Sequence, residues 1–165
     1  MSIGEYQLHE IEMMAKHEEA IGRLYDVYAQ KLPDYEKFWL TLAEEERTHA
    51  SWIRQLSESV EEGDLTFNEG RFNLQAIETS LRYLEDWTRQ AGTASMTMLK
   101  ALAIAADIEN ALIDRKFFEI YEADSEYLQA VLKALEEAAR EHRDRVTAML
   151  TKVRQGEPPG DTAIG

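Results

Sequence analysis

The chain has 165 residues and no cysteine, which excludes disulfides, thiolate zinc sites, iron–sulfur clusters and a rubredoxin-type iron centre within this sequence. Its 32 acidic side chains outnumber 18 lysines and arginines, and the formal net charge is −14. Because a field of that sign repels phosphate backbones, we expect no nucleic-acid partner.

Apolar residues recur with helical spacing along most of the chain, and no segment shows the alternation that is typical of a strand. The pattern predicts four long helices and one shorter helix. The long helices are expected at about 5–31, 34–61, 95–122 and 126–154, and the shorter one at about 71–90. The predicted fold class is therefore all-α.

Small and polar residues separate the later helices. Gly92 is typical of a helix stop, and Thr93 or Ser95 is expected to cap the helix that follows. The last long helix is expected to begin after a cap at Asp124 or Ser125. These breaks place the turns of the predicted fold.

Two long helices, a crossover and two more long helices are the outline of a four-helix bundle with one long connection. We predict a single domain over residues 1–154, built from two antiparallel hairpins. The short crossover helix lies between the second and third long helices. The remaining residues, 155–165, are predicted to form a disordered tail.

Polar residues interrupt the apolar stripe of every long helix. The interrupting residues are Glu18 in the first helix, Glu46 and His49 in the second, Glu109 in the third and His142 in the fourth. Each occupies a position where 3-and-4 spacing calls for an apolar side chain. All five are therefore predicted to face the bundle axis.

The heights of these residues can be compared by counting from the turns. Glu18 and Glu46 are equidistant from Leu32, which lies beside the predicted break between the first two helices. Glu109 and Ala139, one turn before His142 in the fourth helix, are equidistant from the break at Asp124. The polar residues of both antiparallel hairpins are thus expected at one level.

A metal ion explains this arrangement physically. An ionised carboxylate in a dry core costs several kcal/mol unless it is paired or bound to a cation, and neighbouring carboxylates raise one another's pKa. Oxygen and imidazole ligands without sulfur suit iron or manganese, with zinc also possible. Singly, Glu46-x-x-His49 could be chance in an acidic chain, Glu18 a boundary residue and His142 a hydrogen-bonded core histidine. The agreement of all five favours a metal site.

Three segments resemble the rubrerythrin-like domains of the ferritin-like superfamily: "EEAIGRLYDVYA", "LAEEERTHA" and "DIENALIDRKFFEIY". The resemblance covers about residues 5–153. It implies a di-iron carboxylate centre with Glu18, Glu46, His49 and Glu109 among its ligands. It also suggests an internal duplication, in which "LEEAAREHRDRV" aligns with "LAEEERTHASWI" and pairs His142 with His49.

The fourth helix departs from the family pattern. Ala139 stands where the second bridging glutamate of that family would be, and Glu136 lies one turn earlier as a weak substitute. Three outcomes are open. The site could hold two ions asymmetrically, completed by water or Glu136. It could hold one ion, or it could be metal-free with carboxylates that share protons.

The resemblance implies non-haem iron chemistry with oxygen or peroxide, of a ferroxidase-like or peroxidase-like kind. Tyr25 is a candidate catalytic residue that could donate hydrogen bonds or electrons, although packing alone would also explain an aromatic residue on the stripe. A peroxidase would need an external electron donor. The alternative function is a degenerate, metal-free bundle that serves as a binding or assembly module.

The predicted oligomeric state follows from the same resemblance, and the predicted location follows from the composition of the chain. Ferritin-like bundles often pair side by side, so we expect a homodimer. The most apolar run, "MLKALAIAA", is short and contains Lys100, and the N-terminus has neither a basic start nor an apolar signal core. We therefore expect a cytoplasmic protein that does not cross a membrane.

Overall fold

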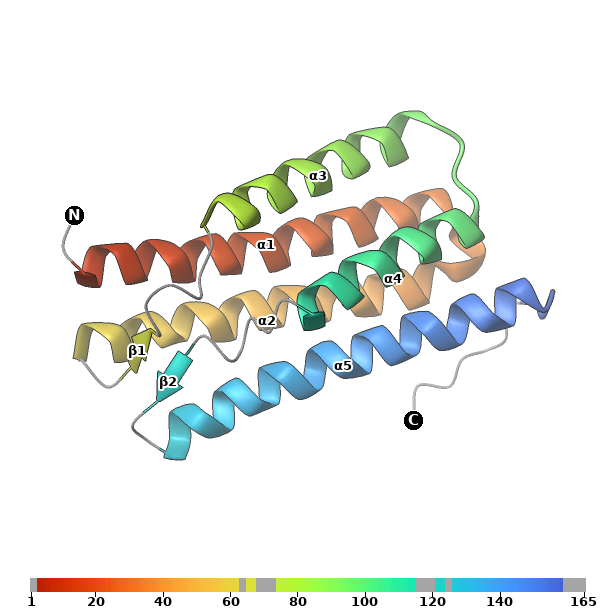
Figure 1. Cartoon of the computed structure of the whole chain (residues 1–165). Coiled ribbons are helices and arrows are strands. Elements are labelled where there is room, and N and C mark those ends of the chain that lie inside the picture. Colours follow the sequence, from red (N-terminus) through yellow and green to blue (C-terminus); the bar gives the residue numbers. More distant parts are fainter. Residues whose placement is uncertain (1–2, 63–64, 68–73, 115–120, 124–125, 159–165) are drawn as a thin grey trace.

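The computed structural model describes residues 3–62, 65–67, 74–114, 121–123 and 126–158. Helices account for nearly all of them, which confirms the predicted helical bundle (Figure 1). The helices are α1 (Ile3–Lys31), α2 (Glu36–Glu62), α3 (Leu74–Thr93), α4 (Met98–Asp114) and α5 (Glu126–Arg154), with a 3-10 turn, η1 (Pro33–Tyr35), between α1 and α2. None of the described helices combines the length and apolarity needed to cross a membrane.

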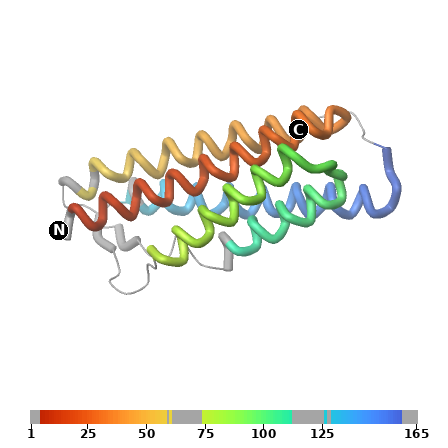
Figure 2. The backbone as a smooth tube through the Cα atoms, turned by 90° about the horizontal axis from the view of Figure 1, so that it is seen from above, coloured from red at the N-terminus to blue at the C-terminus, as the bar shows by residue number. Residues whose placement is uncertain are grey.

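The long helices form two hairpins. α1 packs along α2, and α4 packs along α5, with the two members of each pair running in opposite directions (Figures 1 and 2). α3 lies along α1 and carries the chain back to the other end, so that α2 and α4 run in the same direction. The crossover helix therefore packs on its own bundle.

Two short strands were not predicted. β1 (Leu65–Phe67) pairs antiparallel with β2 (Tyr121–Ala123), with Thr66 opposite Glu122. The prediction of one helix over 95–122 is thus wrong at its end, because α4 ends at Asp114 among the described residues. Within the two strands, Thr66, Phe67 and Tyr121 are β-branched or aromatic residues, which favour a strand once a partner strand is available.

The cap of α4 also differs from the prediction. The Thr97 hydroxyl accepts a hydrogen bond from the Lys100 backbone N–H at 3.2 Å, so Thr97 is the N-cap. Thr93 cannot serve, because it lies in the last turn of α3 and its hydroxyl donates to the Arg89 carbonyl at 3.1 Å. Ser95 lies in the connection between the two helices. The predicted caps Asp124 and Ser125 lie outside the described residues.

The C-terminal boundary agrees with the sequence analysis. α5 ends at Arg154, and Gly156 follows with a φ of +73°, the left-handed conformation in which glycine commonly ends a helix. Its N–H donates to the Val153 carbonyl at 3.1 Å. The predicted tail begins at this point, and 159–165 lie outside the described residues.

The core is built on the apolar stripes, with an aromatic cluster between α1 and α2. Trp39 lies at the centre of this cluster, with ring centroids 5.3 Å from Tyr25, 4.9 Å from Tyr28 and 5.0 Å from Phe38. One turn from Glu18, Gly22 lets the two helices approach closely, because a Cβ there would lie 3.2 Å from the Ala43 carbonyl oxygen. The described core also buries six polar side chains: Glu10, His17, Glu46, His49, Glu109 and His142.

Glu10 is a buried carboxyl group whose pKa should make the stability of the fold depend on pH. Burial raises its pKa to about 7, although a hydrogen bond from Tyr6 favours the ionised form. The folded state therefore holds this proton more tightly than the unfolded state does. This tighter proton binding stabilises the folded state fully below the unfolded pKa of 4.5, and the stabilisation is lost as the pH rises through about 7.

The Glu10→Gln substitution should therefore stabilise the protein at high pH and not at low pH. We expect a gain of about 1–2 kcal/mol near pH 8 that shrinks towards zero near pH 5, since one pKa unit corresponds to about 1.4 kcal/mol. Urea unfolding at both pH values measures the difference between variant and wild type. A gain that is independent of pH would contradict the assignment.

Candidate metal centre

Four helices bring the five predicted polar residues together at one level. Glu18 comes from α1, Glu46 and His49 from α2, Glu109 from α4 and His142 from α5. They line one cavity of about 10 Å³, which is about the space that one water molecule needs. Its other walls are apolar: Ile53, Leu135 and Ala139. The helical stripes therefore predicted which side chains meet in the core.

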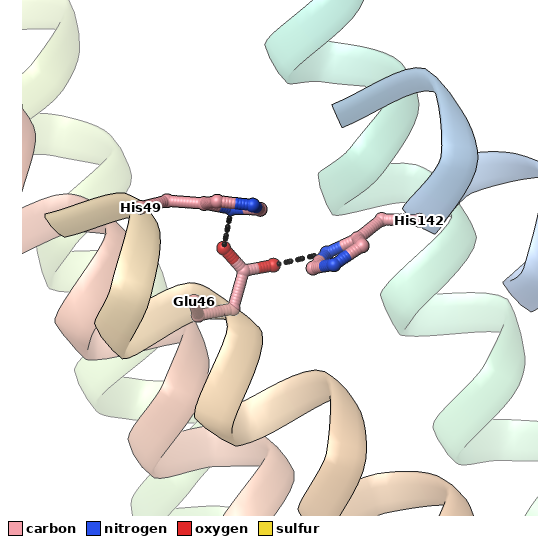
Figure 3. Close-up of side chains that lie close together, drawn as sticks. All are labelled: Glu46, His49 and His142. Carbon is pink, nitrogen blue, oxygen red and sulfur yellow. Dashed lines mark hydrogen bonds and ion pairs between the residues drawn. The ribbon is translucent and has the colours of Figure 1, made fainter. Parts of the chain in front are cut away.

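Glu46 lies at the centre of this cavity. Its Oε2 is 3.2 Å from Nδ1 of His49, and its Oε1 is 2.8 Å from Nδ1 of His142 (Figure 3). The carboxylate is only 1% exposed. One ligand atom from each of these three residues lies within 4.8 Å of the other two, so this buried group could hold a metal ion.

Two further carboxylates lie near the two histidines. Glu18 Oε2 is 3.8 Å from His49 Nδ1, and Glu109 Oε1 is 3.9 Å from His142 Nδ1. We call Glu18, His49 and Glu46 Oε2 the His49 half-site. Glu109, His142 and Glu46 Oε1 form the His142 half-site. Each half-site offers one imidazole nitrogen, one outer carboxylate and one oxygen of the shared Glu46.

Tyr25 supports the His142 half-site. Its hydroxyl donates a hydrogen bond to Glu109 Oε1 at 2.7 Å. Burial and the nearby charges of Glu109 and Glu46 raise the Tyr25 pKa well above its usual value, so the phenol remains a donor. Tyr25, the candidate catalytic residue, thus touches a candidate ligand and also packs in the aromatic cluster.

The fourth helix offers no carboxylate to the cavity. Ala139 lines it with a methyl group. The Glu136 carboxylate instead accepts a hydrogen bond from Arg140 at 2.7 Å and is 42% exposed. One turn of helix separates Glu136 from the cavity level, so the structure does not bring this predicted residue into the site.

Protons balance the charges of the metal-free centre. Burial and the charge of Glu46 raise the pKa of Glu18 and Glu109 to about 8. Burial also opposes ionisation of Glu46, but hydrogen bonds from His142 and His49 outweigh it and hold the Glu46 pKa well below its usual range. At neutral pH the two outer carboxyls therefore keep their protons, whereas Glu46 is ionised.

The two imidazoles are held in their charged form. Burial disfavours their charged form, but the carboxyl groups of Glu18 and Glu46 raise the pKa of His49 to about 9. Glu45 and Glu46 likewise raise the pKa of His142 to about 10. Without metal, the centre is thus an anion between two cations. Because a metal ion needs neutral imidazole and ionised carboxylate, its binding must release protons.

Comparison with known proteins gives no identification. Family models, curated proteins and solved structures contain no match to this chain. The resemblance to rubrerythrin-like domains therefore rests on the motifs themselves.

Glu45 was missed by the sequence analysis. Its Oε2 lies 2.6 Å from His142 Nε2, the imidazole nitrogen that faces away from the cavity, and its Oε1 accepts a hydrogen bond from Arg145 at 3.2 Å. Glu45 lies off the apolar stripe of α2, so periodicity gave no signal for it. A carboxylate on the outer nitrogen fixes an imidazole so that its other nitrogen is presented to a metal.

Glu45→Gln should weaken metal binding while leaving the cavity residues in place. We expect roughly tenfold lower affinity for a divalent ion, the lower end of the usual effect of removing such an outer partner. The matched control is Glu44→Gln, because Glu44 is exposed on the same helix and pairs with Arg47. Titration calorimetry compares the variants, and equal affinities would show that Glu45 does not position His142.

Proposed function

We propose that this chain is a ferritin-like, non-haem iron protein whose metal centre lies between the two helical hairpins. The observation that carries the proposal is the position of Glu46, with each oxygen against Nδ1 of a different histidine. A carboxylate shared in this way is suited to bridge two ions. The order and direction of the helices support the ferritin-like arrangement.

The residues of the cavity fit iron or manganese. Three carboxylates and two imidazoles supply oxygen and nitrogen ligands without sulfur, a donor set that these metals accept. Glu18 and His49 would hold one ion, Glu109 and His142 the other, and Glu46 would serve both. Ala139 leaves the opposite side without a second bridging carboxylate, so we expect the second ion to bind more weakly than the first.

A bound iron centre would supply redox chemistry with oxygen or peroxide, of a ferroxidase-like or peroxidase-like kind. The side chains of this chain would orient and enclose it. Tyr25 holds the Glu109 carboxylate through its hydroxyl, and Ile53 and Leu135 add apolar walls to the cavity. With no cysteine in the sequence, a peroxidase would take its electrons from a separate donor protein or small molecule.

A second candidate is a metal-free bundle that binds or assembles with a partner. Two observations favour it. Ala139 removes a ligand, and the two imidazolium groups are already paired with the carboxylates of Glu45 and Glu46 without metal. The two candidates differ in one measurable property, because only the first gains more stability from iron or manganese than from a divalent ion that merely screens charge.

Thermal unfolding separates the candidates. Under anaerobic conditions, ferrous iron or manganese at about 100 times its dissociation constant should stabilise the fold by about 2.7 kcal/mol, which corresponds to a rise of roughly 5–10 °C for a chain of this size. Magnesium is the matched control ion, because it prefers oxygen ligands and retains its water. No rise with iron or manganese, or an equal rise with magnesium, would favour the metal-free candidate.

A further inference from the structure

A second, larger cavity lies outside the metal centre. It has a volume of about 160 Å³ and opens between α1, α3 and α4. It shares no lining residue with the metal cavity. An apolar cavity of roughly 150 Å³ in another protein accepts a benzene molecule, so this one has room for a ligand with a body the size of one ring.

The polar wall of this cavity offers hydrogen-bond acceptors. His17 from α1 is buried, and its Nε2 lies 2.7 Å from the Ser80 hydroxyl of α3. In either direction of that hydrogen bond, the Ser80 oxygen keeps a lone pair for a ligand donor. Asp107 of α4 adds a carboxylate that makes no hydrogen bond or ion pair within the described residues.

The remaining lining is aromatic and aliphatic. Trp87 and Tyr83 come from α3, and Tyr83 is 63% exposed at the edge of the cavity. Ile104 and Ile108 of α4 supply much of the apolar surface. Aromatic faces attract cations, and none of the described residues that line the cavity is a lysine or an arginine. The net charge of −14 further favours a positive ligand over a negative one.

We propose that this cavity binds a small organic ammonium ion with an apolar body about the size of one ring. The ammonium group is placed between Asp107 and Ser80, which accept its hydrogen bonds, and the apolar body lies against Trp87 and the isoleucines. An ammonium group carries three donors and no acceptor, which matches the acceptors of this wall. The proposal is independent of the metal centre.

Three probes of one shape test the charge preference: benzylamine, benzyl alcohol and benzoate. Calorimetric titration of the full chain should give the tightest binding for benzylamine and the weakest for benzoate. Asp107 is exposed at the cavity mouth, so Asp107→Asn should weaken benzylamine binding by about twofold to fivefold, the usual range for an exposed ion pair, and should leave benzyl alcohol unchanged. The matched control is Asp86→Asn, the same change on α3 at a residue that does not line the cavity.

Ligand binding at this cavity can be distinguished from metal binding at the metal centre. Binding should be equal with and without a divalent ion, and Trp87→Ala should weaken all three probes. Equal affinity for the amine and the alcohol would overturn the proposal, as would an Asp107→Asn variant that behaves like Asp86→Asn. Absence of benzylamine binding would overturn it too, whether or not the chain binds iron.

Discussion

Glu46→Gln should retain no iron after anaerobic loading and desalting, and its melting temperature should not respond to ferrous iron or manganese. Among the residues that the structure describes, Glu46 is the only one whose two oxygens contact both histidines, so its amide removes one charged ligand from each half-site. The metal-free variant should also be less stable by about 2–4 kcal/mol, because two buried imidazolium groups lose the anion between them.

Glu44→Gln provides the control for this experiment. Glu44 lies two residues away on α2, and its side chain is 72% exposed. The substitution changes the net charge by the same amount without touching the cavity. We expect wild-type iron content and wild-type thermal stabilisation from it. A Glu46→Gln variant that binds iron as well as this control would show that Glu46 is not the shared ligand.

Ala139→Glu should have opposite effects on the metal-free and metal-loaded protein. Ala139 is 8% exposed and lines the cavity at the level of the shared carboxylate. A fourth carboxyl group there must be desolvated beside three others, so the metal-free variant should lose about 2–4 kcal/mol of stability. With two divalent ions bound, the added carboxylate should bridge them and raise the affinity for the second ion.

The test compares iron content and melting temperature with and without metal. We expect two ions per chain in Ala139→Glu, against one to two in the wild type, and a larger metal-dependent rise in melting temperature. Ala138→Glu is the matched control, because it adds the same side chain one residue away and outside the cavity lining. If Ala139→Glu and this control both retain a single ion per chain, the His142 half-site does not hold a second ion.

The sequence predicted which polar residues meet in the core better than it predicted the contacts that they make. Glu18, Glu46 and Glu109 could be found because each interrupts an otherwise regular apolar stripe, and a buried carboxylate is rare enough to be informative. Helical periodicity also fixed the ends of α5, where Glu126–Arg154 matches the predicted range. Periodicity reports which face of a helix is buried, which is the information these predictions needed.

The remaining features depend on contacts between distant segments. β1 and β2 are three residues each and form only because residues 65–67 meet 121–123. Glu45 faces His142 across 97 positions of sequence, and neither residue's local pattern indicates the other. The hydrogen bond between His17 and Ser80 likewise requires α3 to lie on α1. No single-segment pattern contains this information.

Metal stoichiometry tests the central claim most directly. The protein would be loaded with ferrous iron without oxygen, desalted and measured by elemental analysis, with Glu46→Gln treated in parallel. The account predicts at least one iron ion per chain in the wild type, approaching two when free iron is kept in excess, and none in the variant. A wild-type chain that retains no iron would contradict the account and leave a helical bundle whose buried charges are balanced by protons alone.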